Sequence, residues 1–166
     1  MKKFVIMFAG VPGSSKSPVA HHLGWNLGLP IFNNDTLRTE IAEDSGEVEL
    51  GRYEALRDAR LEQLLALNHS FIYDASVDRQ WLNAKKWLDD HDYEHFVINM
   101  DLDRSFIEKI YKAKGYTQVD KLDGWFDDHE KFNNSHADIV NVRIGTEDFS
   151  NRLDIALNAV NNWINT

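Results

Sequence analysis

The chain opens with an apolar run that passes directly into a glycine-rich loop and then into a helical pattern. Residues 4–8 read Phe-Val-Ile-Met-Phe, a continuous apolar stretch typical of a strand buried on both faces of a parallel sheet. Two glycines and three serines follow within residues 10–17, and residues 16–28 have amphipathic helical spacing. A strand, a tight loop and a helix in this order predict an α/β fold with a parallel sheet.

The rest of the chain continues the alternation. Further apolar strands are predicted at residues 30–32, 71–73, 95–100 and 137–142, and further helices at 35–44, 51–68, 78–90, 103–114 and 147–164. We therefore predict one domain over residues 1–166, a three-layer, doubly wound sandwich around a five-stranded parallel sheet. In the last helix, Thr146 is the expected N-cap, with Glu147 and Asp148 in the first turn. Ligands of such folds bind beyond the carboxyl ends of the strands.

Composition excludes several classes of function. The 166 residues contain 18 Lys and Arg against 27 Asp and Glu, a formal net charge of -9, and no cysteine. Disulfides, thiolate-bound zinc, iron–sulfur clusters and a cysteine nucleophile are thereby excluded. The acidic balance argues against a broad duplex-binding face and leaves room for a small basic cleft. Because the first apolar run is too short for a secretory signal and no later run could span a membrane, we expect a cytoplasmic protein without membrane contact.

Residues 115–135, termed the lid segment below, are polar and acidic apart from aromatic residues such as Trp125 and Phe126. No helix is predicted here. The segment is either a surface excursion between the fifth helix and the last strand or a mobile lid over a site.

The loop after the first strand has the composition of a phosphate-binding loop. Its sequence is close to GxxxxGK[ST], with Ser15 in the place of the second glycine. In such loops backbone N–H groups surround the phosphates, the lysine reaches the β and γ oxygens, and the hydroxyl binds Mg²⁺. The alternative is a Gly/Ser turn that happens to precede Lys-Ser. The predicted ATP-binding residues are Gly10, Val11, Pro12, Gly13, Ser14, Ser15, Lys16 and Ser17.

This loop, GVPGSSKS, resembles the GxPGSGKS loop of the small P-loop kinases. Residues 30–38, which end in Asp-Thr-Leu-Arg, resemble the strand and DxxR segment of polynucleotide 5′-hydroxyl kinases and of the related zeta-toxin and AAA-type small kinases. Residues 71–76 resemble the strand of these proteins that ends in Asp-Ala-Ser. The resemblance extends from Lys3 to about Val142. It implies a P-loop NTPase fold of the nucleoside-kinase-like type, with Asp35 as general base and Arg38 holding the acceptor or its phosphate.

The residues themselves are compatible with these roles. Asp35 would lie at a strand end beside the loop, where a carboxylate can accept the proton of an attacking alcohol; the alternative is a helix N-cap. Arg38 lies one helical turn further on, where its guanidinium suits a phosphate or carboxylate; the alternative is a solvated surface residue. Asp74 ends the third strand and could hold a Mg²⁺-bound water or orient Ser17; the alternative is an ordinary strand end.

Two departures from the resemblance concern the loop. A side chain at Ser15 predicts a negative φ there if the phosphate site is to survive. Pro18 stands where the relatives usually carry threonine, and it offers neither hydroxyl nor N–H to a phosphate.

A third departure concerns the lid. The relatives supply arginines, whereas residues 108–115 offer only Lys109, Lys112 and Lys114. Either lysine serves, or Arg104 or Arg143 substitutes, or activity is weakened or lost.

The sequence therefore predicts a phosphotransferase that uses ATP and Mg²⁺ and acts on a hydroxyl acceptor. Lys16, Asp35 and Arg38 are the predicted catalytic residues, and Ser17 and Asp74 the predicted metal ligands. The main interpretation is a polynucleotide 5′-kinase-like enzyme. The alternatives are a kinase of a sugar, nucleoside or antibiotic, and a non-catalytic nucleotide-binding module.

Overall fold

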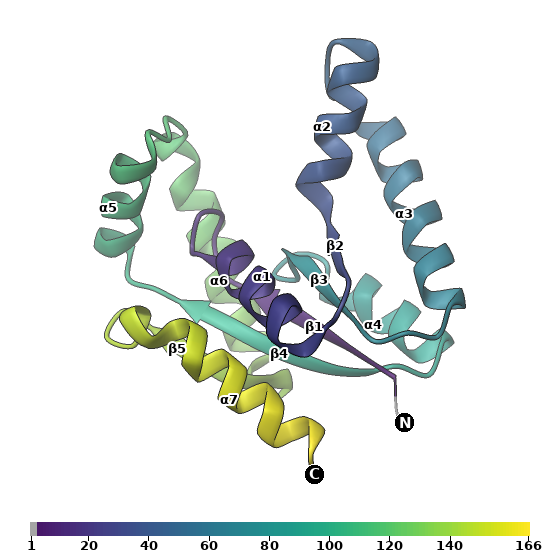
Figure 1. Cartoon of the computed structure of the whole chain (residues 1–166). Helices are drawn as coiled ribbons and strands as arrows, with labels where there is room; N and C mark the ends of the chain where they lie inside the picture. Colours follow the sequence, from purple (N-terminus) through teal and green to yellow (C-terminus); the bar gives the residue numbers. More distant parts are fainter. Residues whose placement is uncertain (1–2) are drawn as a thin grey trace.

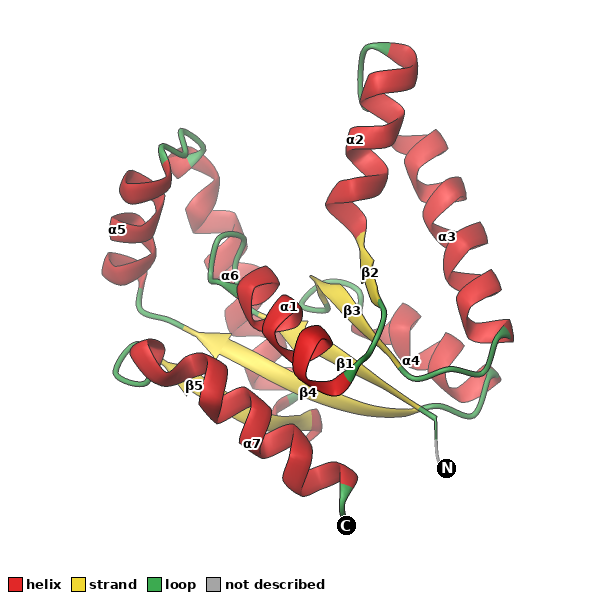
Figure 2. Ribbon diagram, in the orientation of Figure 1, coloured by secondary structure: helices red, strands yellow, loops and turns green. Residues whose placement is uncertain are grey.

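The computed structural model describes residues 3–166, in which each strand is followed by one or two helices (Figures 1 and 2). The elements, in chain order, are β1 (Phe4–Ala9), α1 (Lys16–Leu27), β2 (Ile31–Asn33), α2 (Asn34–Ser45), α3 (Leu50–Ala66), β3 (Phe71–Ser76), α4 (Trp81–Asp90), β4 (Glu94–Asp101), α5 (Arg104–Lys114), η1 (Val119–Lys121), α6 (Leu122–Ser135), η2 (Ala137–Ile139), β5 (Val140–Gly145), η3 (Phe149–Asn151) and α7 (Arg152–Ile164). The strands form one parallel sheet in the order β2-β3-β1-β4-β5. The predicted fold class and the five-stranded sheet are confirmed.

Helices cover both faces of the sheet, which explains why β1 is apolar at every position. Ile6 and Phe8 lie in the hydrophobic cluster formed with α1 and α7. Val5 and Met7 point to the opposite face, into the cluster formed with α3 and α4. All four side chains are fully buried, because successive residues of a strand point to opposite faces and both faces are covered.

Two parts of the molecule extend beyond the carboxyl ends of the strands. Helices α2 and α3 form one projecting pair, and α5 with the start of α6 forms the other, on the far side of the loop between β1 and α1 (Figure 1). A third apolar cluster joins α5 and α6 to that loop; it contains Val11, Leu102, Ile107, Tyr111 and Leu122. The loop after β1 therefore lies between the two projecting parts (Figure 1).

The lid segment is more ordered than its composition suggested. Residues 122–135 form helix α6, so the absence of a helix in the prediction was wrong there. Leu122, His129 and Phe132 are its buried residues, and their spacing places them on one side of the helix. Only one narrow face of α6 is buried, and the polar residues between these positions hid the helical pattern.

The start of the last helix was also predicted wrongly. Helix α7 begins at Arg152, after a short 3₁₀ turn at residues 149–151. Thr146 does not cap it; its Oγ1 accepts a hydrogen bond from the backbone N–H of Asp103, 2.8 Å away. Within residues 3–166 there is no helix with both the length and the apolar character needed to cross a membrane.

Candidate functional site

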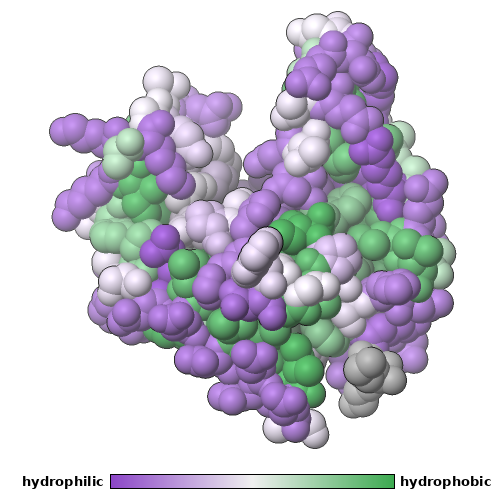
Figure 3. All heavy atoms as spheres, in the orientation of Figure 1, coloured by the Kyte–Doolittle hydropathy of each residue, from purple (hydrophilic) through white to green (hydrophobic). Residues whose placement is uncertain are grey.

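A cavity of about 630 Å³ opens between the two projecting parts, above the loop that follows β1. The space-filling view shows these parts as largely hydrophilic, with a hollow between them (Figure 3). The loop, the start of α2, the first half of α3, the end of β3 and the start of α6 all contribute lining residues. Its volume is in the range of small-molecule sites, about 300–1,000 Å³.

Two glycines allow the loop to follow its path. Gly10 has a φ of +132°, and a Cβ there would lie 2.8 Å from the carbonyl oxygen of Met100. Gly13 has a φ of +82°, and a Cβ there would lie 2.5 Å from Cε1 of Tyr111. The Tyr111 hydroxyl donates a hydrogen bond to the Pro12 carbonyl at 2.8 Å, so α5 supports the loop at the same point. Neither glycine position can accept a side chain without local rearrangement.

Ser15 differs from its prediction. Its φ is +77°, so the expectation of a negative φ was wrong; Ser15 is the N-cap residue of α1 and lies in the left-handed region. Nε of Arg152, at the start of α7, donates a hydrogen bond to Ser15 Oγ at 2.8 Å. The guanidinium of Arg152 also lies 4.1 Å from the ring centroid of Phe149. Arg152 thus holds the serine in a backbone conformation that usually requires glycine.

Lys16 lies over the loop. Its Nζ donates to the carbonyl oxygens of Gly10 and Val11, at 2.6 and 2.7 Å. Burial lowers the pKa of Lys16 to about 8, against the attraction of nearby carboxylates, of which Asp78 is the strongest. The lysine is therefore held where the loop would receive the phosphates of a nucleotide.

Ser17 and Asp74, the two residues predicted to hold the metal, are in contact. Ser17 Oγ donates to one carboxylate oxygen of Asp74 at 3.1 Å, and Nδ2 of Asn33 donates to the other at 2.5 Å. Hydroxyl and carboxylate oxygens are the donors that Mg²⁺ prefers, so this pair fits the ion chemically. Among the described residues, no group of three or more His, Asp or Glu could hold a metal by itself. Mg²⁺ is commonly held by one or two side chains together with substrate phosphates, which suits this arrangement.

Asp35 and Arg38 line the same cavity as Lys16. The N-cap of α2 is Asn33, whose side chain accepts the Thr36 N–H at 2.9 Å, so Asp35 is not the cap. Nη1 of Arg38 donates to the Asp35 carboxylate at 2.8 Å, and the Asp35 side chain is 81% exposed. The N-cap alternative for Asp35 is thereby removed.

The lid segment and α5 bring one lysine to the cavity. Lys114 lines it, with Nζ 3.4 Å from the Gly13 carbonyl oxygen, and burial together with nearby Arg152 lowers its pKa. The other two lysines of α5 do not line the cavity. Arg104 is paired with carboxylates of α5 and α6, Arg143 with Asp101, and neither lines the cavity.

Sequence reasoning missed several residues in and around the site, of which four matter to the argument below. Tyr53 and Arg57 line the cavity from α3, and their spacing of four on a correctly predicted helix could have revealed them. Asp78 lines it from the connection after β3. His129 contacts Asp78 from α6, and no signal in the sequence could reveal it without that helix.

Comparisons with known proteins show the same fold. No protein-family model matches the chain, and no curated protein matches its sequence. Among solved structures, a gluconokinase from Sinorhizobium meliloti is 16% identical with a TM-score of 0.67, covering 98% of this chain and 93% of its own. A shikimate kinase from Acinetobacter baumannii is 15% identical with a TM-score of 0.64, at 98% and 94% coverage. The APS kinase of Mycobacterium tuberculosis, solved with AMPPNP and APS, is 16% identical with a TM-score of 0.59, at 96% and 98% coverage.

The chain has the fold of these small P-loop kinases. Each likeness covers nearly the whole of both chains, so the fold is shared from end to end. The more specific resemblance to polynucleotide kinases and zeta toxins receives no support from these three structures, which are named for small-molecule kinases.

Proposed function

We propose that this protein is an ATP-dependent kinase that transfers the γ-phosphoryl group to a hydroxyl of a small, anionic acceptor. The observation that carries the proposal is that the phosphate-binding loop, Lys16, Asp35 and Arg38 line the same cavity. A nucleotide on the loop and an acceptor against α2 and α3 would share that cavity, with the carboxylate of Asp35 within it.

Each residue has a separate role in the proposed transfer. The loop backbone and Lys16 bind the β- and γ-phosphates at the N-terminus of α1. Asp35 accepts the proton of the attacking hydroxyl as the phosphoryl group moves. Ser17 and Asp74 would hold Mg²⁺, which supplies neutralisation of phosphate charge when it is bound. Lys114 offers a positive charge to the phosphates from the lid side.

The size and charge of the site favour a small acceptor over a polynucleotide. A cavity of about 630 Å³ can hold one drug-sized molecule with part of a nucleotide, but no extended strand. Long nucleic acids are bound along tracks of Lys and Arg, and the net charge of this chain is -9. The named substrates of the compared kinases are small molecules as well. We therefore propose the small-molecule alternative in place of the polynucleotide one.

Two arginines indicate that the acceptor carries an anionic group. The guanidinium groups of Arg38 and Arg57 lie 4.5 and 5.6 Å from the ring centroid of the buried Tyr53. Contact with an aromatic ring restrains a guanidinium. Arg38 uses one nitrogen on Asp35 and Arg57 uses Nε on Asp58, and the remaining N–H groups can bind a planar or tetrahedral anion. Both arginines line the cavity on the side of α2 and α3. A phosphate, sulfate or carboxylate of the acceptor would bind there.

An acceptor panel tests the proposal. Purified protein with Mg²⁺ and γ-labelled ATP would be incubated separately with gluconate, shikimate, APS, deoxyadenosine and a 5′-hydroxyl oligonucleotide, and label on the acceptor would be measured. We expect transfer to an anionic small molecule that changes little as salt rises, and its loss in Lys16→Ala. Transfer to the oligonucleotide that falls steeply with salt would restore the polynucleotide interpretation. ATP binding without transfer to any acceptor would support the non-catalytic module.

A further inference from the structure

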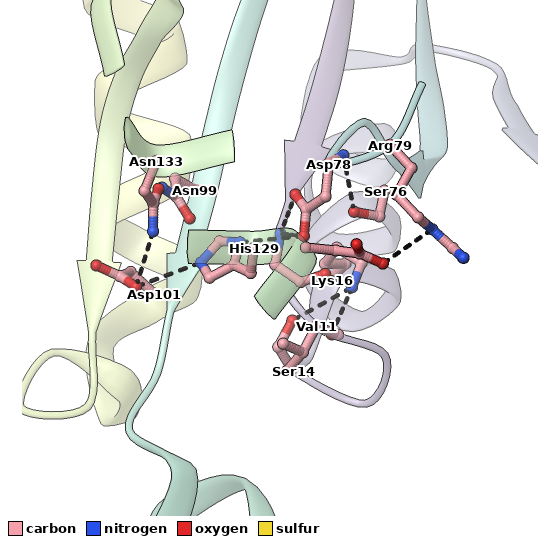
Figure 4. A network of polar contacts seen from close by, with 12 residues as sticks. Val11, Ser14, Lys16, Ser76, Asp78, Arg79, Asn99, Asp101, His129 and Asn133 are labelled. Atoms are coloured by element: carbon pink, nitrogen blue, oxygen red, sulfur yellow. Dashed lines mark hydrogen bonds and ion pairs between the residues drawn. The ribbon is translucent and has the colours of Figure 1, made fainter. Parts of the chain in front are cut away.

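A buried charge cluster lies directly behind the phosphate-binding loop (Figure 4). Its centre is His129 of α6, whose side chain is 5% exposed. Nδ1 is 3.0 Å from Oδ2 of Asp78, and Nε2 is 3.3 Å from Oδ1 of Asp101. Ionised carboxylates only accept hydrogen bonds, so both ring nitrogens must donate, and the ring is an imidazolium.

Asp78 connects this cluster to the loop. Its Oδ1 accepts the backbone N–H of Gly10, the first loop residue, at 3.0 Å. Among the carboxylates that act on Lys16, Asp78 exerts the strongest attraction. The Asp78 side chain is 8% exposed and lines the cavity. One carboxylate thus contacts the loop backbone and lies close to its lysine.

Asp101 fixes the other side of the histidine. It ends β4, and its second carboxylate oxygen accepts a hydrogen bond from Nη1 of Arg143 on β5. Nδ2 of Asn133, one turn after His129 on α6, donates to the same oxygen of Asp101 as the histidine, at 3.4 Å. Asn133 in turn accepts from Asn99 of β4 at 2.6 Å. His129 is therefore held between the sheet and the loop, with little room to turn.

This arrangement addresses an electrostatic problem of the loop. Asp78 is a nearly buried negative charge beside a loop that must receive the negative phosphates of a nucleotide. In a poorly hydrated site such a charge repels an anion strongly. The imidazolium of His129, in contact with Asp78, offsets that repulsion while Asp78 keeps its hydrogen bond to Gly10.

We infer that His129 is a positioning residue for nucleotide binding: from helix α6 it neutralises and holds Asp78, so that the loop can accept phosphate. This rests on the proposed function only in that the loop binds the phosphates of ATP, and it is independent of the acceptor. A residue outside the loop, on the lid side of the molecule, would thereby set the affinity of the nucleotide site.

The surroundings of His129 favour its charged form at neutral pH. Burial opposes protonation, but the hydrogen bonds to Asp101 and Asp78 outweigh it and raise the pKa of His129 to about 9. The other charges near the cluster are Arg143, behind Asp101, Lys16, beyond Asp78, and the ion pair of Arg79 with Asp128, at 3.5 Å.

Charge rescue separates this role from a purely structural one. The dissociation constant of Mg²⁺-AMPPNP would be measured by calorimetry at pH 7 for the wild type, His129→Gln, Asp78→Asn and the double variant. We expect His129→Gln to weaken binding about tenfold, the order expected for one charge roughly 12 Å from an anion at an effective dielectric constant of about 20. Asp78→Asn in the same chain should restore binding to within about threefold, because no uncompensated charge then remains.

A matched control is His91→Gln. His91, at the end of α4, also contacts a carboxylate, with Nε2 2.9 Å from Glu62, but it does not line the cavity. Its variant should bind AMPPNP as the wild type does. Unchanged binding in His129→Gln, or a double variant as weak as His129→Gln alone, would overturn the inference. A wild type that binds no AMPPNP would instead refute the nucleotide site itself, and the inference with it.

A second variant covers the case in which His129→Gln does not fold. Asp101→Asn removes one carboxylate from the histidine without touching the loop, so His129 should lose its proton at a lower pH. We expect wild-type affinity at pH 6 and weaker binding than the wild type at pH 8.5. Burial lowers the pKa of Lys16 to about 8, so the variant is compared with the wild type at each pH rather than with itself at the other pH. An Asp101→Asn variant that binds Mg²⁺-AMPPNP as tightly as the wild type at pH 8.5, as well as at pH 6, would refute the role of His129.

Discussion

Ser15 offers a direct test of the loop conformation. Its φ of +77° places an L-residue in the left-handed region, which costs about 1–2 kcal/mol relative to glycine. Ser15→Gly removes this strain and also the hydroxyl that accepts the hydrogen bond from Arg152 at 2.8 Å. Ser15→Ala removes the same hydroxyl and keeps the strain. The two variants therefore differ mainly in the backbone cost at one residue.

The magnitudes follow from these two contributions. A hydrogen bond to a charged group contributes about 1.5–3 kcal/mol, so Ser15→Ala should lower the free energy of unfolding by about that amount. Ser15→Gly should recover about 1 kcal/mol of the loss, because relief of strain exceeds the added entropy of glycine in the unfolded chain. In a chain of this size the glycine variant should therefore melt about 2–4 °C above the alanine variant.

Urea unfolding at pH 7, followed by circular dichroism, would measure both variants. Tight agreement of their m-values would show that the unfolded states are comparable. An alanine variant as stable as the glycine variant, or more stable, would show that residue 15 does not have a positive φ. The explanation of how this loop functions with serine in the place of glycine would then fail.

Three further predictions concern the surroundings of the loop. Gly13→Ala should destabilise the protein by more than about 1 kcal/mol in thermal melts, because its Cβ would lie 2.5 Å from a Tyr111 ring carbon at a φ of +82°; an unchanged melting temperature would contradict this. The hydrogen bonds to Asp101 and Asp78 raise the pKa of folded His129 to about 9, above the ordinary value of about 6.5. The charged histidine therefore stabilises the folded state fully below about pH 6.5, and this contribution disappears as pH rises through 9. Unfolding free energies from pH 6 to 9.5 should therefore fall more steeply in the wild type than in His129→Gln, and parallel curves would refute the assignment. Arg38→Lys should raise the KM for the acceptor and leave the KM for ATP nearly unchanged in steady-state kinetics, because lysine lacks the planar fork; a selective rise in the KM for ATP would place Arg38 on the nucleotide.

The phosphate-binding loop was predictable because its chemistry is local. Its parts follow one another directly in the chain: the apolar run, the glycines at 10 and 13, and the Lys-Ser pair. The physical role of each part can be inferred from its residue types alone. The conformation of Ser15 was not predictable in the same way. It is held by Arg152, which is 137 positions away in the chain, and no local rule specifies such a partner.

Helix α6 shows a different limit. Its buried residues are few and are separated mainly by charged side chains, so the periodicity was too weak to recognise. Because the helix was missed, its histidine could not be placed behind the loop. The start of α7 was mispredicted because of a tertiary contact. Thr146 is a good N-cap by residue type, but its hydroxyl accepts a hydrogen bond from the backbone N–H of Asp103 instead.

The most direct test of the account is phosphoryl transfer in a single-turnover experiment with the best acceptor of the panel. Enzyme in excess over γ-labelled ATP would be mixed with that acceptor for the wild type and for Asp35→Asn. We expect label on the acceptor hydroxyl, a transfer rate about 10²–10⁴ times lower in Asp35→Asn, and little change in ATP affinity. Transfer at the wild-type rate in Asp35→Asn would contradict the assignment of the base.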